Sequence, residues 1–350
     1  MKLNKSIAMM VVAMVLLIGG VSSGWMKTST TKVAVITDVH HRDDIAQEYW
    51  QVFPGDYQYR QFSTAEVRLT AAVDQANTSG CNLFISLGDI VDQCYGNYAG
   101  EDLDADIAAR LADCFAITDT FTGDGIALAI GNHEKYLWGG VLVDDFDDYW
   151  GDVENGHNHV ARTHRYSDVD GDSVGYTFDY NHIRFVVMYA YGNDINISST
   201  QLNWLHKGDG TGVLETDLPC VVLAHGVIYV DGVHDTQMYD TVGNSAVVTA
   251  LFETAGNVKL VMSGHFHRNG IDGYDNQFAN TVNGITYLAL RGSILGAENG
   301  TSSDTATVED SAHWVIEIED VGDNWNITVT GYKLGESDSV VVAKPLGLAA

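Results

Sequence analysis

Basic residues are scarce in this chain. Among its 350 residues, 18 lysines and arginines stand against 47 aspartates and glutamates, which gives a formal net charge of −29. A surface this acidic repels nucleic acids and anionic membranes, so we exclude a role in binding either polyanion. The acidic residues are spread along the chain and form no tail, which indicates a solvated, salt-tolerant surface. Attraction of cations to metal sites is the alternative interpretation.

Proline is also rare, with 3 residues in the whole chain. The sequence contains no proline-rich linker, no long low-complexity stretch and no internal repeat. Its hydrophobic content of 45% is that of a globular protein large enough to bury a sizeable core. One continuous domain over residues 25–350, with insertions near residues 94–104 and 138–172, is therefore the simplest organisation.

Long apolar runs are absent after the first residues of the chain. Lys2 and Lys5 precede an almost unbroken apolar run over residues 7–18, and small residues follow at 21–24. This pattern predicts a secretory signal peptide over residues 1–24 and an exported protein, periplasmic or extracellular, that is soluble after cleavage. An uncleaved membrane anchor is the alternative, although the run is short for a full span.

The 4 cysteines matter because disulfides persist in exported proteins. They form no Cys-x-x-Cys pair, which argues against a structural zinc site or a redox motif. Cys94 follows a polar motif and Cys114 lies on a segment with helical periodicity, and we predict a disulfide between them. Cys81 and Cys220 each precede a strand and are expected to be buried thiols.

Strands and helices are predicted to alternate along the rest of the chain. Apolar, often β-branched runs predict strands over 33–37, 82–87, 126–130, 174–180, 182–189, 221–224, 258–262, 287–290, 314–319 and 325–330. Helical periodicity predicts helices over 65–75, 105–117, 199–206 and 245–254.

Five short polar motifs follow apolar runs of this kind. They are Asp38-Val39-His40, Gly88-Asp89-Ile90-Val91-Asp92, Gly131-Asn132-His133-Glu134, Ala224-His225-Gly226 and Gly264-His265-Phe266-His267. In open α/β sheets, ligands collect at the carboxyl ends of strands. Five such motifs therefore predict a cluster of oxygen and nitrogen ligands, which is what a pair of divalent metals requires.

Single motifs are weaker evidence than the set. Asp38 and His40 share one face of an extended chain and could hold one metal, but such pairs also occur on ordinary surfaces. His41 would point to the opposite face and is a candidate substrate contact. Asp89 could bridge two metals with its two oxygens or simply occupy a turn. Glu134 is either an acceptor that supports the ligands or the first turn of a helix.

The histidines of the last two motifs favour the interpretation as a metal site. His225 alone would more often be a histidine with satisfied hydrogen bonds in the core. The alternating imidazoles of His265 and His267 behind an apolar run are a strong local metal signal.

The ordered set resembles the calcineurin-like metallophosphoesterase superfamily. The pattern of that superfamily is Asp-x-His, Gly-Asp-x-x-Asp, Gly-Asn-His-Asp/Glu, His and Gly-His-x-His, and all five elements occur here in order within residues 33–292. The resemblance implies an α+β fold, a four-layer α/β/β/α sandwich of two mixed sheets flanked by helices, with two metals at its edge. It makes residues 25–350 a single catalytic domain.

The resemblance also implies a role for each motif residue. The first metal would be held by Asp38, His40, Asp89 and His267, and Asp89 would bridge to a second metal held by Asn132, His225 and His265. A hydroxide between the metals would attack phosphorus in line. His133 would stabilise the developing charge or protonate the leaving oxygen, and Asp92 would orient His133. This mixed ligation suits Mn, Fe or Zn better than Ca or Mg.

Departures from particular branches limit the substrate class. Gln93 stands where the protein Ser/Thr phosphatases have an arginine, and His40 and Asp92 stand where purple acid phosphatases have glycine and tyrosine. We therefore expect an exported, metal-dependent hydrolase of small phosphomonoesters or nucleotide-type phosphodiesters. A catalytically silent metal- or ligand-binding module on the same fold is the alternative. The sequence does not separate monoesterase from diesterase, and no heptad pattern indicates an oligomeric state.

Overall fold

The computed structural model describes residues 29–41, 47–53, 56–61, 64–92, 103–135, 158–167, 173–191, 196–229, 242–266, 277–292, 312–320, 325–333 and 343–347. The expected signal peptide, Cys94, His267 and most of both expected insertions lie outside these residues. The Cys94–Cys114 disulfide therefore stays a prediction, while Cys81 and Cys220 are buried free thiols as expected. No helix within the described ranges is long and apolar enough to cross a membrane.

The first sheet joins the beginning of the chain to its end. It has 6 strands in the order β15-β14-β13-β1-β4-β5. The strands are β1 (Thr30–Ile36), β4 (Leu83–Ser86), β5 (Gly125–Leu128), β13 (Ala312–Asp320), β14 (Trp325–Lys333) and β15 (Ala343–Gly347). Strands β1, β4 and β5 run parallel, so their carboxyl ends meet at one edge, while β13 pairs with β1 in the antiparallel sense.

The second sheet has 7 strands in the order β11-β12-β10-β9-β8-β7-β6. They are β6 (Thr163–Ser167), β7 (Ser173–Tyr180), β8 (Ile183–Val187), β9 (Cys220–Ala224), β10 (Val258–Phe266), β11 (Gln277–Val282) and β12 (Ile285–Arg291). Strands β8, β9, β10 and β12 are parallel, and β6, β7 and β11 add antiparallel edges. The sheet is therefore mixed, like the first.

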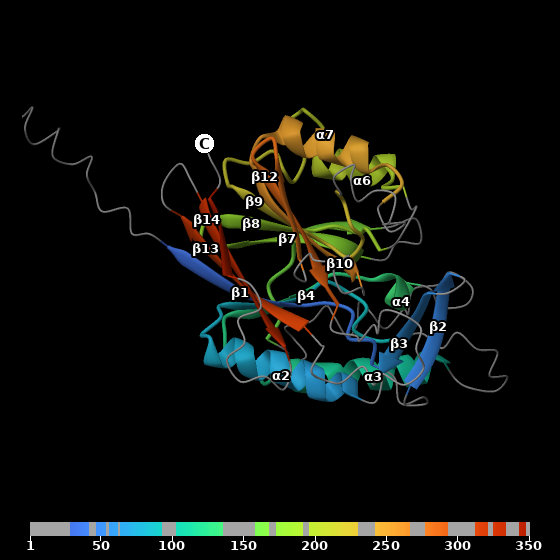
Figure 1. Ribbon diagram of the computed structural model, residues 1–350. Helices are drawn as coiled ribbons and strands as arrows, with labels where there is room; N and C mark the ends of the chain where they lie inside the picture. The colour runs from blue at the N-terminus through green and yellow to red at the C-terminus, as the bar shows by residue number, and fades with distance from the viewer. Residues whose placement is uncertain are drawn as a thin grey trace, which may run out of the picture.

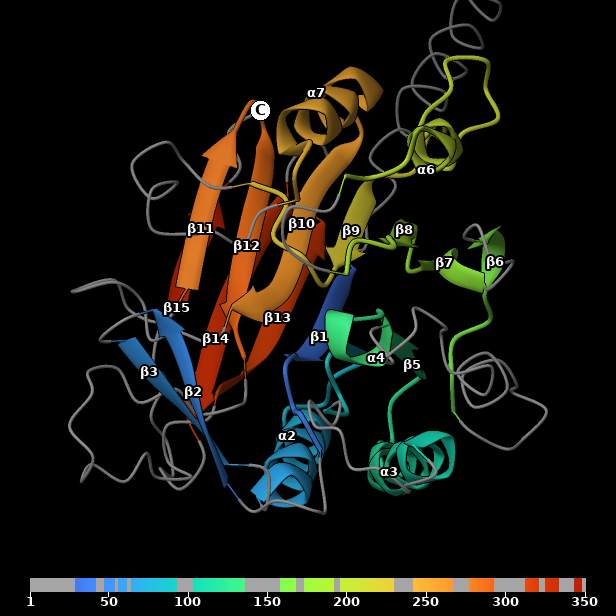
Figure 2. The ribbon, with the colours of Figure 1, turned by 90° about the vertical axis from the view of Figure 1, so that its right-hand side faces the viewer.

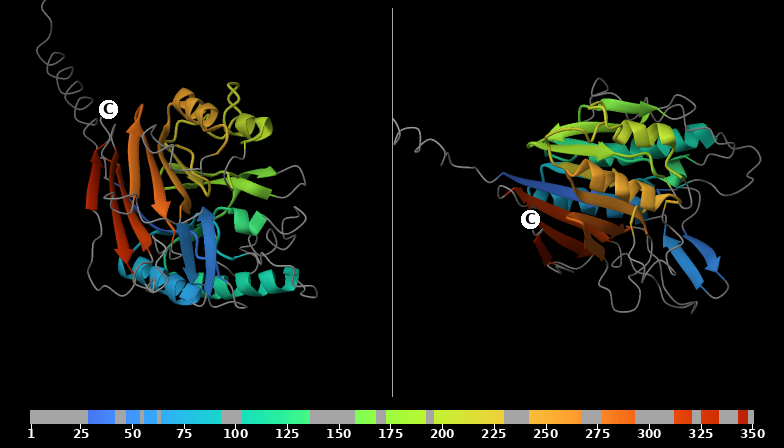
Figure 3. Two further views of the ribbon diagram at one scale, coloured as in Figure 1. Left: turned by 45° about the vertical axis from the view of Figure 1, so that its right-hand side comes forward. Right: turned by 90° about the horizontal axis from the view of Figure 1, so that it is seen from above.

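Helices cover the outer face of each sheet. Figure 1 shows α2 (Ala65–Thr78) and α3 (Leu103–Thr118) beneath the first sheet, and α6 (Ser199–Leu205) and α7 (Ser245–Ala255) above the second. The short helix α4 (Asn132–Lys135) lies near the carboxyl ends of the central strands (Figure 2). The hairpin of β2 (Gln47–Phe53) and β3 (Asp56–Gln61) stands apart from both sheets (Figure 3). The four-layer α/β/β/α sandwich expected from the resemblance is confirmed.

Successive side chains of the central strands alternate between two hydrophobic clusters, which explains how the two sheets pack together. On β9, Val221 and Leu223 belong to the core cluster shared with the first sheet, whereas Val222 and Ala224 belong to the cluster beneath α6 and α7. A strand buried on both faces has to be apolar at every position, as β9 is. The described residues of the five polar motifs come shortly after such strands, or at the end of one, so that Asp38, Asp89, His225 and His265 meet at a common edge.

Candidate metal centre

Three of the polar motifs leave neighbouring parallel strands of the first sheet. Asp38 follows β1, Asp89 follows β4 and Asn132 follows β5. The loops after β1 and β4 continue to pair beyond the sheet, because the amides of Asp38 and His40 donate to the carbonyls of Gly88 and Asp89 at 3.0 and 2.9 Å. The two candidate ligand loops therefore lie side by side, because the parallel pairing of β1 and β4 continues into them.

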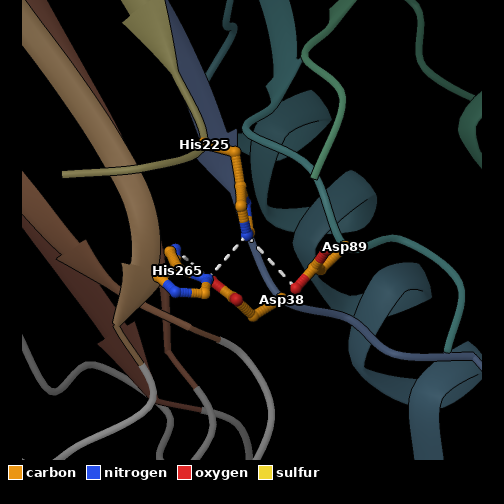
Figure 4. Close-up of side chains that lie close together, drawn as sticks. All are labelled: Asp38, Asp89, His225 and His265. Atoms are coloured by element: carbon orange, nitrogen blue, oxygen red, sulfur yellow. Dashed lines mark hydrogen bonds and ion pairs between the residues drawn. The ribbon is translucent and has the colours of Figure 1, made fainter. Parts of the chain in front are cut away.

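The other two motifs come from β9 and β10, which are parallel neighbours in the second sheet. His225 follows β9, and His265 lies near the end of β10. The amide of Gly264 donates to the carbonyl of His225 at 3.0 Å, which fixes the two histidine positions relative to each other. Figure 4 shows Asp38, Asp89, His225 and His265 pointing toward one another from the two sheets.

The backbone at the candidate ligands is unusual. Asp38, His40, Asp89 and His265 have φ values of 55, 50, 52 and 65°. Residues other than glycine rarely adopt this left-handed conformation, and each instance costs roughly 1 kcal/mol or more. Such strain persists where the surrounding structure over-determines it, which is typical of functional sites.

Asp89 lies at the centre of the cluster. Its Oδ2 atom lies 3.2 Å from Nε2 of His225, 3.6 Å from Nε2 of His40 and 3.9 Å from Nε2 of His133. This oxygen is buried and has no hydrogen-bond partner among the described residues. Its other oxygen, Oδ1, accepts the backbone amide of His133 at 2.8 Å. A buried carboxylate oxygen surrounded by imidazole nitrogens is the arrangement expected of a metal ligand.

His225 is held so that one nitrogen faces the centre. Its Nδ1 atom lies 2.8 Å from the carbonyl oxygen of Leu87, which can only accept a hydrogen bond. Nδ1 therefore donates, and Nε2 points at Oδ1 of Asn132 (3.1 Å) and Nδ1 of His265 (3.0 Å). Fixing a histidine through its other ring nitrogen is the usual way in which proteins orient a metal-binding imidazole.

Asp38 joins the two halves of the cluster. Its Oδ1 atom lies 3.8 Å from Nε2 of His40, and its Oδ2 atom accepts the hydroxyl of Thr37 at 2.7 Å and the amide of His265 at 3.0 Å. The ligating atoms of Asp38, Asp89, His225 and His265 all lie within 4.8 Å of one another. The structure thus brings together every expected metal ligand that it describes, and His267 lies outside the described residues.

Asp92 contacts two histidines. Its Oδ1 atom lies 2.7 Å from Nδ1 of His40 and 2.6 Å from Nδ1 of His133. The two rings meet edge to face with their centroids 4.4 Å apart. The resemblance implied that Asp92 orients His133. The second contact, with His40, could not be read from the sequence because it depends on how the loops after β1 and β4 pair.

Glu134 supports the ligand loops. The sequence left its role open between such a support and the first turn of a helix. One oxygen accepts the amides of Asp89 and Gly131 at 2.8 and 2.7 Å, and the other accepts those of Ile90 and Val91 at 2.6 and 3.2 Å. Glu134 is 1% exposed. It therefore ties the loop after β5 to the loop after β4, and both interpretations hold, because Glu134 also lies in the first turn of α4.

Two arginines support the same loops and were not foreseen. Arg68 on α2 is 2% exposed and donates to the carbonyl of Val39 at 3.0 Å. Arg110 on α3 is 3% exposed and donates to the carbonyl of Asp92 at 3.4 Å. The available sequence signal was an arginine at a position where helical periodicity requires an apolar side chain.

The charges of the cluster shift the pKa values of its side chains. Burial opposes ionisation of Asp89, but the imidazoles of His225 and His133 outweigh it and lower the pKa of the Asp89 carboxyl. Burial likewise opposes protonation of His225, yet the Asp89 carboxylate outweighs it and raises the pKa of that imidazole to about 9. A divalent cation would take the place of this proton, since metal binding at imidazoles displaces protons.

These observations fit metal ions at the cluster. The donors are carboxylate, amide and imidazole atoms, which together suit first-row divalent metals. Oδ2 of Asp89 and Nε2 of His225 lie 3.2 Å apart and give the donor set a common centre. The left-handed backbone at four of these positions costs energy that the surrounding structure offsets, which is consistent with a preorganised centre.

Comparison with known proteins agrees with this geometry. The family model of the calcineurin-like phosphoesterases matches residues 31–269. A dimetal phosphatase from Danio rerio is similar in fold, with 15% sequence identity, a TM-score of 0.58, and coverage of 91% of this chain and 99% of that one.

A second structure, TT1561 of Thermus thermophilus, aligns with 11% identity and a TM-score of 0.46 over 82% of this chain and 94% of that one. No curated protein sequence matches significantly. Because the family model covers most of the chain, including all five polar motifs in full, the assignment follows directly: the chain belongs to the calcineurin-like phosphoesterase family.

Proposed function

We propose that the protein is an exported, metal-dependent hydrolase of small phosphomonoesters or nucleotide-type phosphodiesters. The observation that carries the proposal is the convergence of Asp38, Asp89, His225 and His265 from two sheets to within 4.8 Å. In the proposed assignment His40 and His267 complete a first metal site and Asn132 a second, with Asp89 shared by both. Manganese, iron and zinc are the metals that this donor set favours.

The metals would supply Lewis acidity and lower the pKa of a water molecule at the reaction centre. The protein residues would hold the phosphoester and move protons around it. His133 is suited to proton transfer because Asp92 binds its Nδ1 atom at 2.6 Å and Nε2 faces Asp89 at 3.9 Å. His133 would stabilise charge on the phosphoryl oxygens or donate a proton to the leaving oxygen.

Hydrolysis of a chromogenic phosphate ester with added manganese tests this proposal. Activity is expected to be lost with a chelator and restored by manganese, and His133→Ala is expected to lower turnover while the bound metal remains. Unchanged turnover in His265→Ala would reject the metal assignment. Stoichiometric metal without turnover on any phosphoester would favour the catalytically silent module.

The substrate class needs a panel of compounds. A phosphate monoester, a bis-ester, a cyclic nucleotide, a nucleoside diphosphate and a phosphoprotein should be compared at equal concentration under the same metal loading. We expect the monoester or the nucleotide-type diester to be hydrolysed with the highest kcat/KM. A phosphoprotein preferred over both would contradict the proposal.

Export rests on the sequence of residues 1–24. We propose that this segment is removed and that residues 25–350 form a single catalytic domain. N-terminal sequencing of the protein recovered outside the cytoplasm is expected to begin close to residue 25. Recovery of the full-length chain with the membrane fraction would instead indicate an uncleaved anchor.

A further inference from the structure

A second group of metal-binding side chains lies beside the candidate centre. His41 follows His40 directly, but its imidazole lies against Glu66 on α2 and Asp113 on α3. Nε2 of His41 lies 3.8 Å from Oε1 of Glu66 and 3.8 Å from Oδ2 of Asp113. Ligating atoms of the three residues all lie within 4.8 Å of one another. This arrangement places His41 against the helices and leaves it no part in the main cluster.

These separations suit a shared ion better than direct hydrogen bonds. A hydrogen bond between nitrogen and oxygen spans about 2.7–3.2 Å, which is shorter than both contacts of His41. Donors bound to one zinc-like ion at about 2.0–2.2 Å stand roughly 3–3.5 Å apart around it. The separations between His41 and the two carboxylates would therefore need to shorten by roughly 0.3–0.8 Å for a common cation to be bound.

The surroundings of the three side chains favour a cation. His41 is 3% exposed, so its imidazole is held in place by the protein. The side chains of Glu66 and Asp113 are 59% and 57% exposed, so they can adjust and leave positions open for water ligands. Two carboxylates directed at one point repel each other, and a divalent ion would remove that repulsion in a chain whose net charge is −29.

The backbone of His41 connects this group to the ligand loops. Its amide donates to the carbonyl of Ile90 at 2.9 Å, and its carbonyl accepts the amide of Asp92 at 3.0 Å. An ion bound by His41, Glu66 and Asp113 would thus join α2 and α3 to the loops after β1 and β4, which are two of the three loops of the first sheet that carry candidate ligands. Its role would be structural, since it would restrict the movement of those loops without contacting substrate.

We propose that His41, Glu66 and Asp113 form a separate site for a divalent transition metal, zinc or manganese. One imidazole and two carboxylates are a donor set that both ions accept. Water fills the remaining positions. The site does not depend on the phosphoesterase proposal, because it uses none of the residues assigned to that centre.

Metal content of the full chain tests the site. The wild type and the double variant Glu66→Ala/Asp113→Ala are loaded with zinc or, separately, manganese, desalted, and analysed for metal per chain. Both substitutions are at exposed helix positions, so the fold should persist, and circular dichroism checks this. The double variant is expected to hold one equivalent less than the wild type. Equal metal content in the two proteins would overturn the proposal.

A matched control separates a built site from general attraction to an acidic surface. Asp74 is an exposed carboxylate on the same helix, and Asp74→Ala is expected to keep the metal content of the wild type. A loss of metal in Asp74→Ala equal to that in the double variant would also overturn the proposal. Thermal unfolding gives a second measurement, in which added zinc should raise Tm more in the wild type than in the double variant.

The test is independent of catalysis. If the main centre holds no metal, the difference of one equivalent between wild type and double variant remains. If His225→Ala abolishes metal at the main centre, the His41 site is expected to retain its ion. Failure of the proposed hydrolase and failure of this site are therefore distinguished by metal counts alone.

Discussion

Nδ1 of His133 lies 2.6 Å from Oδ1 of Asp92, and the same oxygen lies 2.7 Å from Nδ1 of His40. Burial opposes ionisation of Asp92, but His133 and His40 outweigh it and hold the pKa of its carboxyl well below the usual range. One carboxylate thus orients a candidate metal ligand and a candidate proton donor together. Changes at Asp92 should therefore affect metal binding and turnover in the same protein.

Asp92→Asn is the first prediction. The amide oxygen can occupy the position of Oδ1 and face both imidazole nitrogens, but it carries no negative charge, so both rings lose a charged hydrogen-bond partner. We expect the metal affinity to fall by about 10–100-fold, since outer contacts of this kind have effects of that size. We also expect kcat to be lower than that of the wild type even when the metal is saturating, because the orientation of His133 is weakened. Isothermal titration with manganese and steady-state kinetics measure the two effects. His133→Ala is the matched variant and should lower kcat with little loss of metal affinity.

Glu134→Gln tests the contact between the loops after β4 and β5. The carboxylate accepts four backbone amides, and a glutamine would turn its own N–H groups toward two of them. We expect the free energy of unfolding to fall by about 3 kcal/mol, since buried donors would lose charged acceptors. Denaturant unfolding of the metal-free protein measures it. Glu253→Gln, at an exposed glutamate that accepts one side-chain hydrogen bond, should change stability far less.

Gly131→Ala is expected to disrupt the candidate metal centre through steric overlap alone. A Cβ at this position would lie 2.1 Å from Oδ1 of Asp89 and 2.4 Å from its backbone nitrogen. Asp89 would have to move, and metal content should fall in a protein that retains its helical and sheet signal. The control is Gly80→Ala, where φ is +63° and nothing lies within 4 Å of the added carbon. That variant should lose roughly 1 kcal/mol of stability and keep its metal.

His313 on β13 predicts a dependence of stability on pH that is independent of the metals. Burial lowers the pKa of this imidazole to about 4, and its ring stacks on Tyr332 with centroids 5.5 Å apart. Between pH 6.5 and 4 the unfolded chain binds a proton that the folded chain does not, so stability falls as the pH is lowered through this window.

Relative to His313→Phe, the wild type should lose up to about 3 kcal/mol between pH 6.5 and 4, since the pKa falls from 6.5 to about 4. The comparison uses denaturant unfolding of both proteins at each pH, so that titrating carboxylates common to both cancel. A constant difference between the two proteins over this range would contradict the prediction.

Strand ends were the part of the fold that the sequence predicted well. The apolar runs before Asp38, Asp89 and His225 correspond to β1, β4 and β9, because strands buried on both faces leave an unbroken apolar signature. The strands predicted over 174–180 and 182–189 correspond to β7 and β8, and the turn between them has Asn181 and His182 at φ values of 48 and 64°. Helix α7 ends at Ala255, one residue beyond the predicted end, and Gly256 follows in the left-handed conformation.

Other elements were missed for identifiable reasons. The pair β2–β3 lies outside both sheets and has no run of apolar residues to mark it. The turn between β11 and β12 contains Asn283-Gly284, with φ values of 50 and 80°, and such an Asn-Gly pair between two strands is a strong hairpin signal. Strand β15 pairs with β14 at the edge of the first sheet, and its sequence, Ala-Lys-Pro-Leu-Gly, has no alternating apolar pattern.

Residue types revealed the candidate ligands, but not the contacts that position them. His225 was ambiguous alone, and only the carbonyl of Leu87 shows which of its nitrogens faces the cluster. Arg68 and Glu134 act on backbone groups, so their roles depend on the loop conformation and leave no motif of their own. Spacing along a chain predicts which side chains meet at a sheet edge, whereas their orientation is decided by tertiary contacts.

The candidate ligands come from opposite layers of the sandwich, with Asp38 and Asp89 on one sheet and His225 and His265 on the other. This group of four is complete only after the two layers have docked. Full cation uptake therefore has to follow that docking and cannot guide the nascent polypeptide toward it. In the cell, such a protein would mature in two successive stages, and the ions available in the compartment where it completes folding would decide which metals it carries.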